Sequence, residues 1–191
     1  MRKSKAETAE TRQRIVDIAA RQFRSNGIHA TGLTDVMSEA GLTNGGFYKH
    51  FESKDQLVAE AFQVGIDGVI ESLEAAAANH SALKDAFEAI VETYVSEYHR
   101  DHGDSGCPVA SMGSELVRSG EKTRDAADRG IEDMVKTIAK RIDTKDPKAA
   151  RADAVFTLAA MIGGLTLSRL FADTEAKAFV LETVKQHLVN V

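Results

Sequence analysis

The stretch that decides the fold lies at residues 41–51 and reads GLTNGGFYKHF. It follows a short segment, about residues 33–40, whose apolar side chains recur at helical spacing, and it predicts a second short helix from Thr43 to His50. A glycine-containing turn between two short amphipathic helices is the arrangement of a helix-turn-helix, whose second helix can enter a major groove. The stretch therefore predicts a helix-turn-helix.

The composition of the second helix distinguishes a DNA-facing helix from a buried one. A buried helix would not carry two glycines, an asparagine, a lysine and a histidine. Small residues permit close approach to DNA, and polar side chains reach phosphates and base edges. Phe47 and Phe51, four residues apart, supply the inward face. Alternatively, Gly45 and Gly46 form only a flexible helix start, which costs about 1 kcal/mol per glycine in helix propensity.

The flanking sequence completes a compact head. A first helix is expected from about Thr8 to Ser25, followed by the Asn26-Gly27 C-cap signal. Ser53 is expected to begin a long fourth helix. Residues 1–52 are therefore assigned to a three-helix DNA-binding domain.

The remainder, residues 53–191, is expected to be a helical bundle. No alternating apolar pattern of strand type occurs, so the fold class is all-α. Breaks fall near residues 79–81, 102–106, 120, 143–147 and 172–174, which gives about six helices, counting the one that begins at Ser53.

Composition and charge limit the class of protein. No run approaches the roughly 18 apolar residues of a membrane span, and residues 1–10 are too polar for a secretory signal, so we expect a cytoplasmic protein without a membrane partner. Residues 1–60 hold nine of the 24 basic and eight of the 29 acidic side chains. The head is therefore near neutral, whereas the acidic remainder would be repelled by phosphates.

Enzymatic signatures do not appear in the sequence. We find no phosphate-binding glycine loop, no nucleophile elbow and no metal-spaced cysteine and histidine cluster, and we expect neither an enzyme nor a cofactor. Two alternatives stay open. One is a metal-responsive regulator that uses His99 and His102, and the other is a helical protein-interaction module that does not bind DNA.

Residues 27–31 and 41–51, followed by Ser53 and Lys54, resemble the DNA-binding signature of TetR/AcrR-type repressors. The resemblance implies a homodimer that binds a palindromic double-stranded DNA operator and responds to a small-molecule effector. It also implies DNA contacts by ten residues, with Lys54 as a phosphate clamp and Thr43 as both cap and phosphate contact. These are Thr31, Thr34, Thr43, Asn44, Gly45, Gly46, Tyr48, Lys49, His50 and Lys54. The family commonly has larger polar residues at the positions of Gly45 and Gly46.

The same resemblance assigns residues 53–191 to ligand binding and dimerisation, and the last two helices to a dimer interface. Apolar residues at helical spacing suit that role: Val155, Leu158, Ile162, Leu165, Phe179, Val184 and Leu188. The alternative is that they form an intramolecular core.

Six residues of the middle helices are candidates for the effector site or sensor: Cys107, Phe62, Tyr94, Tyr98, Met112 and Met134. Cys107 precedes Pro108, which suits the first position of a helix, so its thiol is expected at a helix N-terminus that stabilises thiolate. The Gly106-Cys107 pair resembles the Gly-Cys stretch of electrophile-responsive TetR-type regulators. A small, half-buried filler is the alternative role of this cysteine.

Overall fold

The protein is described here by a computed structural model covering residues 4–190. Its described part contains helices and no strands, which confirms the all-α prediction. The α-helices are α1 Lys5–Asn26, α2 Leu33–Glu39, α3 Lys54–Ala78, α4 Leu83–Tyr94, α5 Glu97–Asp101, α6 Pro108–Leu116, α7 Glu121–Ala139, α8 Pro147–Leu170 and α9 Thr174–Val189, and the 3-10 helix η1 spans Asn44–Lys49.

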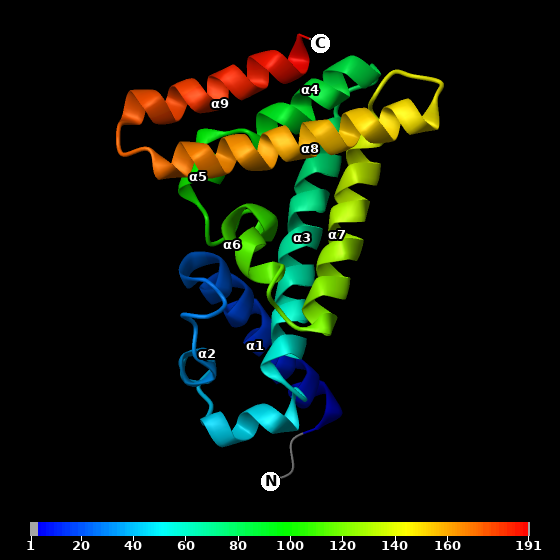
Figure 1. Cartoon of the computed structure of the whole chain (residues 1–191). Coiled ribbons are helices and arrows are strands. Elements are labelled where there is room, and N and C mark those ends of the chain that lie inside the picture. The colour runs from blue at the N-terminus through cyan, green and yellow to red at the C-terminus, as the bar shows by residue number, and fades with distance from the viewer. Residues whose placement is uncertain (1–3, 191) are drawn as a thin grey trace.

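The helices form an elongated molecule with different elements at its two ends (Figure 1). α1, α2 and η1 form the head at the N-terminal end, and α8 and α9 cross the opposite end. α3 and α7 run side by side along the length between them. One continuous apolar core runs from Ile15 in α1 to Leu188 in α9. The head and the body are therefore joined through packed side chains.

Side-chain caps explain several of the helix starts. The Ser4 hydroxyl accepts from Glu7 N at 3.1 Å while the Glu7 carboxylate accepts from Ser4 N, a reciprocal capping box. Ser53 and Asp173 cap α3 and α9 through the same type of bond. Each cap contributes about 1 kcal/mol and sets the residue at which a helix begins.

Two sequence-based predictions of helices were wrong. The segment after Thr43 is a 3-10 helix rather than an α-helix, in line with the low helix propensity of Gly45 and Gly46. Residues 53–190 contain seven helices rather than about six, because the chain breaks at Val95 and restarts with Ser96 as a cap. The Ser96 hydroxyl accepts from His99 N at 3.1 Å, which was the missed signal.

α8 also departs from expectation. Among the described helices it is the one whose length and composition would allow it to cross a membrane. One such helix is weak evidence of a membrane span, since helices packed in the core of soluble proteins pass the same test. Its exposed apolar side chains are described below.

Candidate nucleic-acid interface and sensor region

The turn between α2 and η1 requires a glycine. Gly41 has a φ of 70°, in the left-handed region that side chains rarely adopt. Leu42 N donates to Met37 O at 2.8 Å and Gly41 N donates to Ser38 O at 2.9 Å, which closes the end of α2. These bonds fix the direction in which η1 leaves α2.

Two phenylalanines hold η1 against the head. Phe47 and Phe51 are buried, and their rings stack with centroids 5.4 Å apart. The Arg12 guanidinium lies 4.6 Å from the centroid of the Phe51 ring, and its Nε donates to His50 O at 3.2 Å. This confirms that Phe47 and Phe51 form the inward face, as their spacing predicted.

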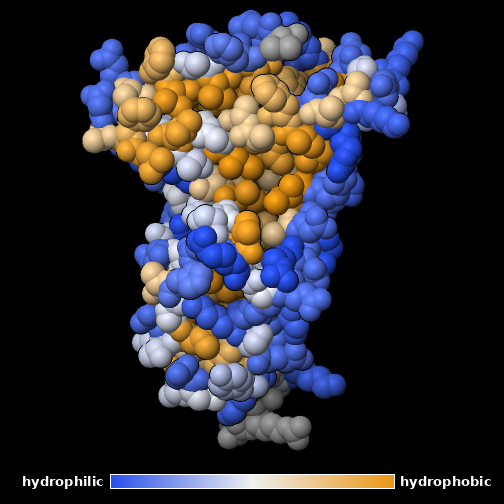
Figure 2. Space-filling model, in the orientation of Figure 1, coloured by the Kyte–Doolittle hydropathy of each residue, from blue (hydrophilic) through white to orange (hydrophobic). Residues whose placement is uncertain are grey.

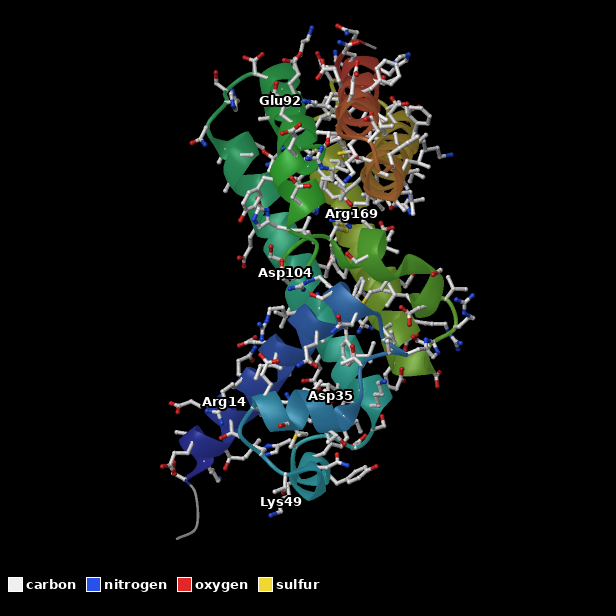
Figure 3. The ribbon with its side chains drawn as sticks, turned by 90° about the vertical axis from the view of Figure 1, so that its left-hand side faces the viewer. Arg14, Asp35, Lys49, Glu92, Asp104 and Arg169 are labelled. Carbon is white, nitrogen blue, oxygen red and sulfur yellow. The ribbon has the colours of Figure 1, made fainter. Side chains whose placement is uncertain are left out.

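The opposite face of η1 is exposed and polar. Asn44, Gly45, Tyr48 and Lys49 are exposed, with Tyr48 at 74%. A Cβ added at Gly45 would meet no atom within 4 Å, so packing within the chain does not require glycine there. Lys49 lies at the end of the molecule farthest from α8 and α9 (Figure 3). A duplex can approach this face without meeting the body.

Two side chains predicted to contact DNA hold the α1–α2 loop in this structure. The buried Thr31 hydroxyl donates to Gly27 O at 2.8 Å. Lys54 Nζ donates to Ile28 O at 2.6 Å and to Thr31 O at 2.7 Å, and partial burial lowers its pKa. Its ammonium thus fastens the loop that leads into α2 and does not reach outward as a phosphate clamp.

The other predicted DNA contacts occupy the same end of the molecule. Thr34 is exposed in the first turn of α2, whereas Gly46 and His50 are half-buried. Thr43 is exposed at the N-cap of η1, but its hydroxyl makes no capping hydrogen bond, contrary to the prediction. Its side chain is therefore not committed to holding the helix.

Two family descriptions match the chain. Residues 15–61 match the bacterial regulatory proteins of the tetR family, and residues 83–187, more than half of the chain, match the C-terminal domain of LmrA/YxaF-like transcriptional regulators. The chain belongs to the TetR family. It is therefore a DNA-binding transcriptional regulator with an N-terminal helix-turn-helix and a C-terminal helical domain, and not an enzyme.

Individual relatives match either the head or the whole chain. The HTH-type transcriptional regulator AcrR of Shigella flexneri is 39% identical over 70 residues, which cover 37% of this chain and 33% of that protein. The uncharacterized HTH-type transcriptional regulator YxaF of Bacillus subtilis is 24% identical over 92% of this chain and 93% of its own. A crystal structure of a TetR transcriptional regulator from Chloroflexus aurantiacus superposes with a TM-score of 0.81 at 27% identity, covering 97% of this chain and 95% of that chain.

Direct hydrogen bonds connect the head of this TetR-family protein to its body. The Glu115 carboxylate of α6 accepts from His29 N at 2.8 Å and contacts His29 Nδ1 at 2.6 Å. Arg24 Nε of α1 donates to the carbonyl oxygen of Asp104, in the loop before α6, at 2.6 Å. Sequence reasoning missed these residues because their partners lie about 80 positions away, beyond any local pattern.

The six sensor candidates do not form one site. Phe62, Met112 and Met134 are buried core residues; a Cβ at Gly130 of α7 would lie 2.9 Å from Phe62, so α3 and α7 are already in close contact there. Tyr94 and Tyr98 instead line a cavity between α3, α4 and α5. The three core residues are not among the residues that line this cavity.

His99 is a structural residue rather than a metal ligand. Its Nδ1 bonds to Tyr94 O at 2.7 Å and its Nε2 accepts from Cys107 N at 2.8 Å, so both ring nitrogens are occupied. His102 Nδ1 lies 2.9 Å from Tyr98 O. Residues 4–190 contain no group of three or more side chains able to hold a metal ion. The described residues therefore give the metal-responsive alternative no support.

Titration of His99 should make the fold acid-sensitive. Burial lowers the pKa of His99 to about 4, from 6.5 in an unfolded chain. Between these values the unfolded chain binds a proton that the folded chain does not, so stability is lost as pH falls below 6.5. We expect His99 to contribute a loss of about 3 kcal/mol in unfolding free energy between pH 7 and pH 4. Urea titrations at both pH values measure it.

The control variant for this pH effect is His99→Asn, which retains a donor and an acceptor and does not titrate. Its unfolding free energy should fall by about 3 kcal/mol less than that of the native protein over the same pH range. Equal losses in the two proteins would show that the ring of His99 does not cause the acid sensitivity.

Cys107 is the N-cap of α6, as its position before Pro108 predicted, but its thiol is fully buried. Burial raises the pKa of the Cys107 thiol, and the backbone N–H groups of Ala110 and Val109 and the Tyr94 hydroxyl offset this only in part. The expectation of a stabilised thiolate was therefore wrong, because loss of water outweighs the helix N-terminus. The alternative role, a small half-buried packing residue, also underestimated the burial of Cys107, whose side chain is fully buried.

Native Cys107 should alkylate slowly. We expect N-ethylmaleimide to react with the folded protein at pH 7 at least about tenfold more slowly than with the same protein in 8 M urea, because the thiol is both protonated and enclosed. Mass spectrometry of quenched aliquots measures the alkylation rates of the folded and the unfolded protein. A native rate equal to the unfolded rate would contradict the buried position of the thiol.

A broad apolar surface lies on one side of the body, in the half of the molecule that α8 and α9 occupy (Figure 2). On α8 its exposed side chains recur on one face, with Phe156 at 67%, Leu167 at 53% and Leu170 at 76%, and Phe179 of α9 is 71% exposed. Ala159 and Gly163 are the small residues of the same α8 face. We call these six residues the α8–α9 face.

Some of the predicted dimer residues are exposed or half-buried, and the others are buried in the core of the protomer. Val155 is exposed, as is Phe179, whereas Ile162 and Val184 are half-buried. The prediction was wrong for Leu158, Leu165 and Leu188, which are buried inside the protomer. The apolar period identified both helices, but it could not tell which side of each packs internally, so it did not single out the exposed residues Phe156, Leu167 and Leu170.

Proposed function

We propose that this TetR-family regulator is a cytoplasmic, effector-responsive repressor that binds a palindromic operator as a homodimer. The observation that carries the proposal is the separation of two surfaces: an exposed polar face on η1 at one end and the exposed α8–α9 face in the other half of the molecule. Because this face lies on the side of the body, two protomers can pair through it side by side, with both heads at the same end of the dimer. An inverted repeat in the operator then matches the twofold symmetry of the protein.

The proposed DNA contacts follow the exposed face of the head. Asn44, Gly45 and Lys49 are assigned to base edges, with half-buried Gly46 permitting close approach. Tyr48, His50, Thr43 and Thr34 are assigned to phosphates. Since Gly45 and Gly46 bring no side-chain donors, few direct base contacts are available, and recognition depends in part on the shape of the duplex.

Selection of bound duplexes from a random pool tests this proposal. The full-length protein is incubated with 30-base-pair random duplexes at about 0.15 M salt, and bound DNA is sequenced after several rounds. The expected result is an inverted repeat whose half-sites are one helical turn, or a multiple of it, apart. Recovery of no enriched sequence, or of a single asymmetric half-site, would contradict it.

A further inference from the structure

We propose that the cavity between α3, α4 and α5 is the effector site, and that it takes an uncharged single-ring aromatic molecule. The inference rests on the proposed function, because it names the ligand class to which the repressor would respond. The cavity has a volume of about 130 Å³. A cavity of about 150 Å³ holds one benzene molecule, so this space is of the size that a single ring fills.

The walls of the cavity combine a buried floor with an exposed mouth. Leu73 of α3 and Tyr94 of α4 are buried and form the floor. Gly68 of α3 and Tyr98 of α5 are exposed, with Tyr98 at 70%, and lie at the mouth. A ligand can therefore enter from solvent and bury its ring against α3.

The chemistry of the lining selects an uncharged aromatic ligand. Lysine, arginine, aspartate and glutamate are absent from the cavity lining among residues 4–190, so an ionised ligand would lose hydration without gaining a counter-charge. Tyr98 stacks on His102 with ring centroids 4.1 Å apart, and Tyr94 meets His99 edge to face at 4.6 Å. Aromatic walls favour a ring placed edge-on or offset against them.

The Tyr94 hydroxyl lies beside the Cys107 thiol. It is buried and has no nitrogen or oxygen partner among residues 4–190; its hydrogen-bonding neighbour is the Cys107 thiol. Sulfur is a weak acceptor, so the donor capacity of this hydroxyl is poorly used. Because that thiol is not among the lining residues, the Tyr94 hydroxyl supplies no polar anchor to a bound ring, and a phenol serves only as a neutral single-ring probe.

The loop that lines the cavity is hydrogen-bonded to the DNA-binding head. The loop that closes the cavity is held at one end by His99, whose Nε2 accepts from Cys107 N at 2.8 Å. In the same loop, Asp104 O accepts from Arg24 Nε of α1 at 2.6 Å, and Asp104 lies between the head and α8 (Figure 3). A ligand that displaces this loop therefore moves a direct hydrogen-bond partner of the first head helix.

The test uses 4-fluorophenol as probe and 4-fluorobenzoate as its anionic counterpart of similar size, both followed by ¹⁹F NMR on the full-length protein at pH 7 without DNA. We expect 4-fluorophenol to bind with a Kd of about 0.1–1 mM, within the range open to so small a ligand. We expect 4-fluorobenzoate to bind at least about tenfold more weakly. No binding of the phenol up to about 10 mM, or equal binding of the two, would overturn the proposal.

Gly68 offers a matched pair of variants. A Cβ at Gly68 would meet no atom within 4 Å, so Gly68→Leu places a side chain at the mouth, whereas Gly68→Ala adds one methyl group. Both replacements favour the helix by up to about 1 kcal/mol, so both should fold. Gly68→Leu should weaken 4-fluorophenol binding at least about tenfold, and Gly68→Ala less than about threefold. Unchanged binding to Gly68→Leu, with Tyr98→Ala also unchanged, would place the ligand elsewhere.

Operator release separates this inference from the proposed function. Saturating 4-fluorophenol should weaken binding of the selected operator at least about fivefold, and Gly68→Leu should abolish that response while retaining operator affinity. Probe binding in the cavity without any operator response would overturn its assignment as the effector site. Failure of the protein to select any operator would instead contradict the proposed function and leave the probe result standing.

Discussion

Replacing Tyr48 and Lys49 together by alanine is expected to weaken operator binding about 100-fold. The two side chains are exposed on the outer face of η1, and each should contribute about 1–2 kcal/mol through contacts with phosphates or base edges. Because neither packs in the core, the variant should retain the native melting temperature within about 2 °C. Fluorescence anisotropy with the selected operator measures the loss.

The matched control for this variant is Lys84→Ala in α4. Lys84 is also exposed and pairs only loosely with Glu88, at 3.8 Å, but it lies outside the head. The Lys84→Ala variant should bind the operator with an affinity within about twofold of the native value. The loss in the double variant should also decrease as salt rises, because ionic contacts to phosphate are screened. A double variant that bound as tightly as the native protein would place the DNA contacts elsewhere.

Replacing Phe156 and Leu167 by glutamate is expected to produce a folded monomer that has lost operator binding. The two residues are three helical turns apart on the exposed side of α8, so both carboxylates would be placed in the proposed dimer interface. A monomer engages one half-site at a time, which lowers the apparent operator affinity at least about 100-fold. Analytical ultracentrifugation and anisotropy measure the two effects.

Val117→Glu is the matched control for the interface. Val117 is 74% exposed after α6 and outside the α8–α9 face, so the same gain of charge should leave the dimer and its operator affinity unchanged. A dimer that persisted in the Phe156→Glu, Leu167→Glu variant, at protein concentrations near the native dissociation constant, would contradict this interface.

The head could be predicted from sequence because its determinants are local. The spacing of Phe47 and Phe51, the turn at Gly41 and the cap at Ser53 each act within a few residues, and the structure confirms all three. The role of Lys54 could not be obtained in this way. It depends on carbonyl oxygens of Ile28 and Thr31, more than 20 residues away, which attract the ammonium into the protein.

The sensor region was predicted less well, for a physical reason. Burial raises a thiol pKa and can outweigh the effect of a helix N-terminus, and the tertiary packing that buries Cys107 cannot be seen in the local sequence. The cavity is equally nonlocal, since it forms where Gly68, Tyr94 and Tyr98 from three helices meet. Tyr94 and Tyr98 were found among the candidates because they are aromatic, but Gly68 has no local signal.

The stoichiometry and selectivity of operator binding test the central claim most directly. The full-length protein is titrated into the selected duplex and into a scrambled duplex of the same composition at about 0.15 M salt. The account predicts two chains per palindromic duplex, a Kd of about 10 nM or below, and at least about 1,000-fold preference over the scrambled sequence. Equal affinity for the two duplexes, or binding of one chain per duplex at saturation, would contradict it.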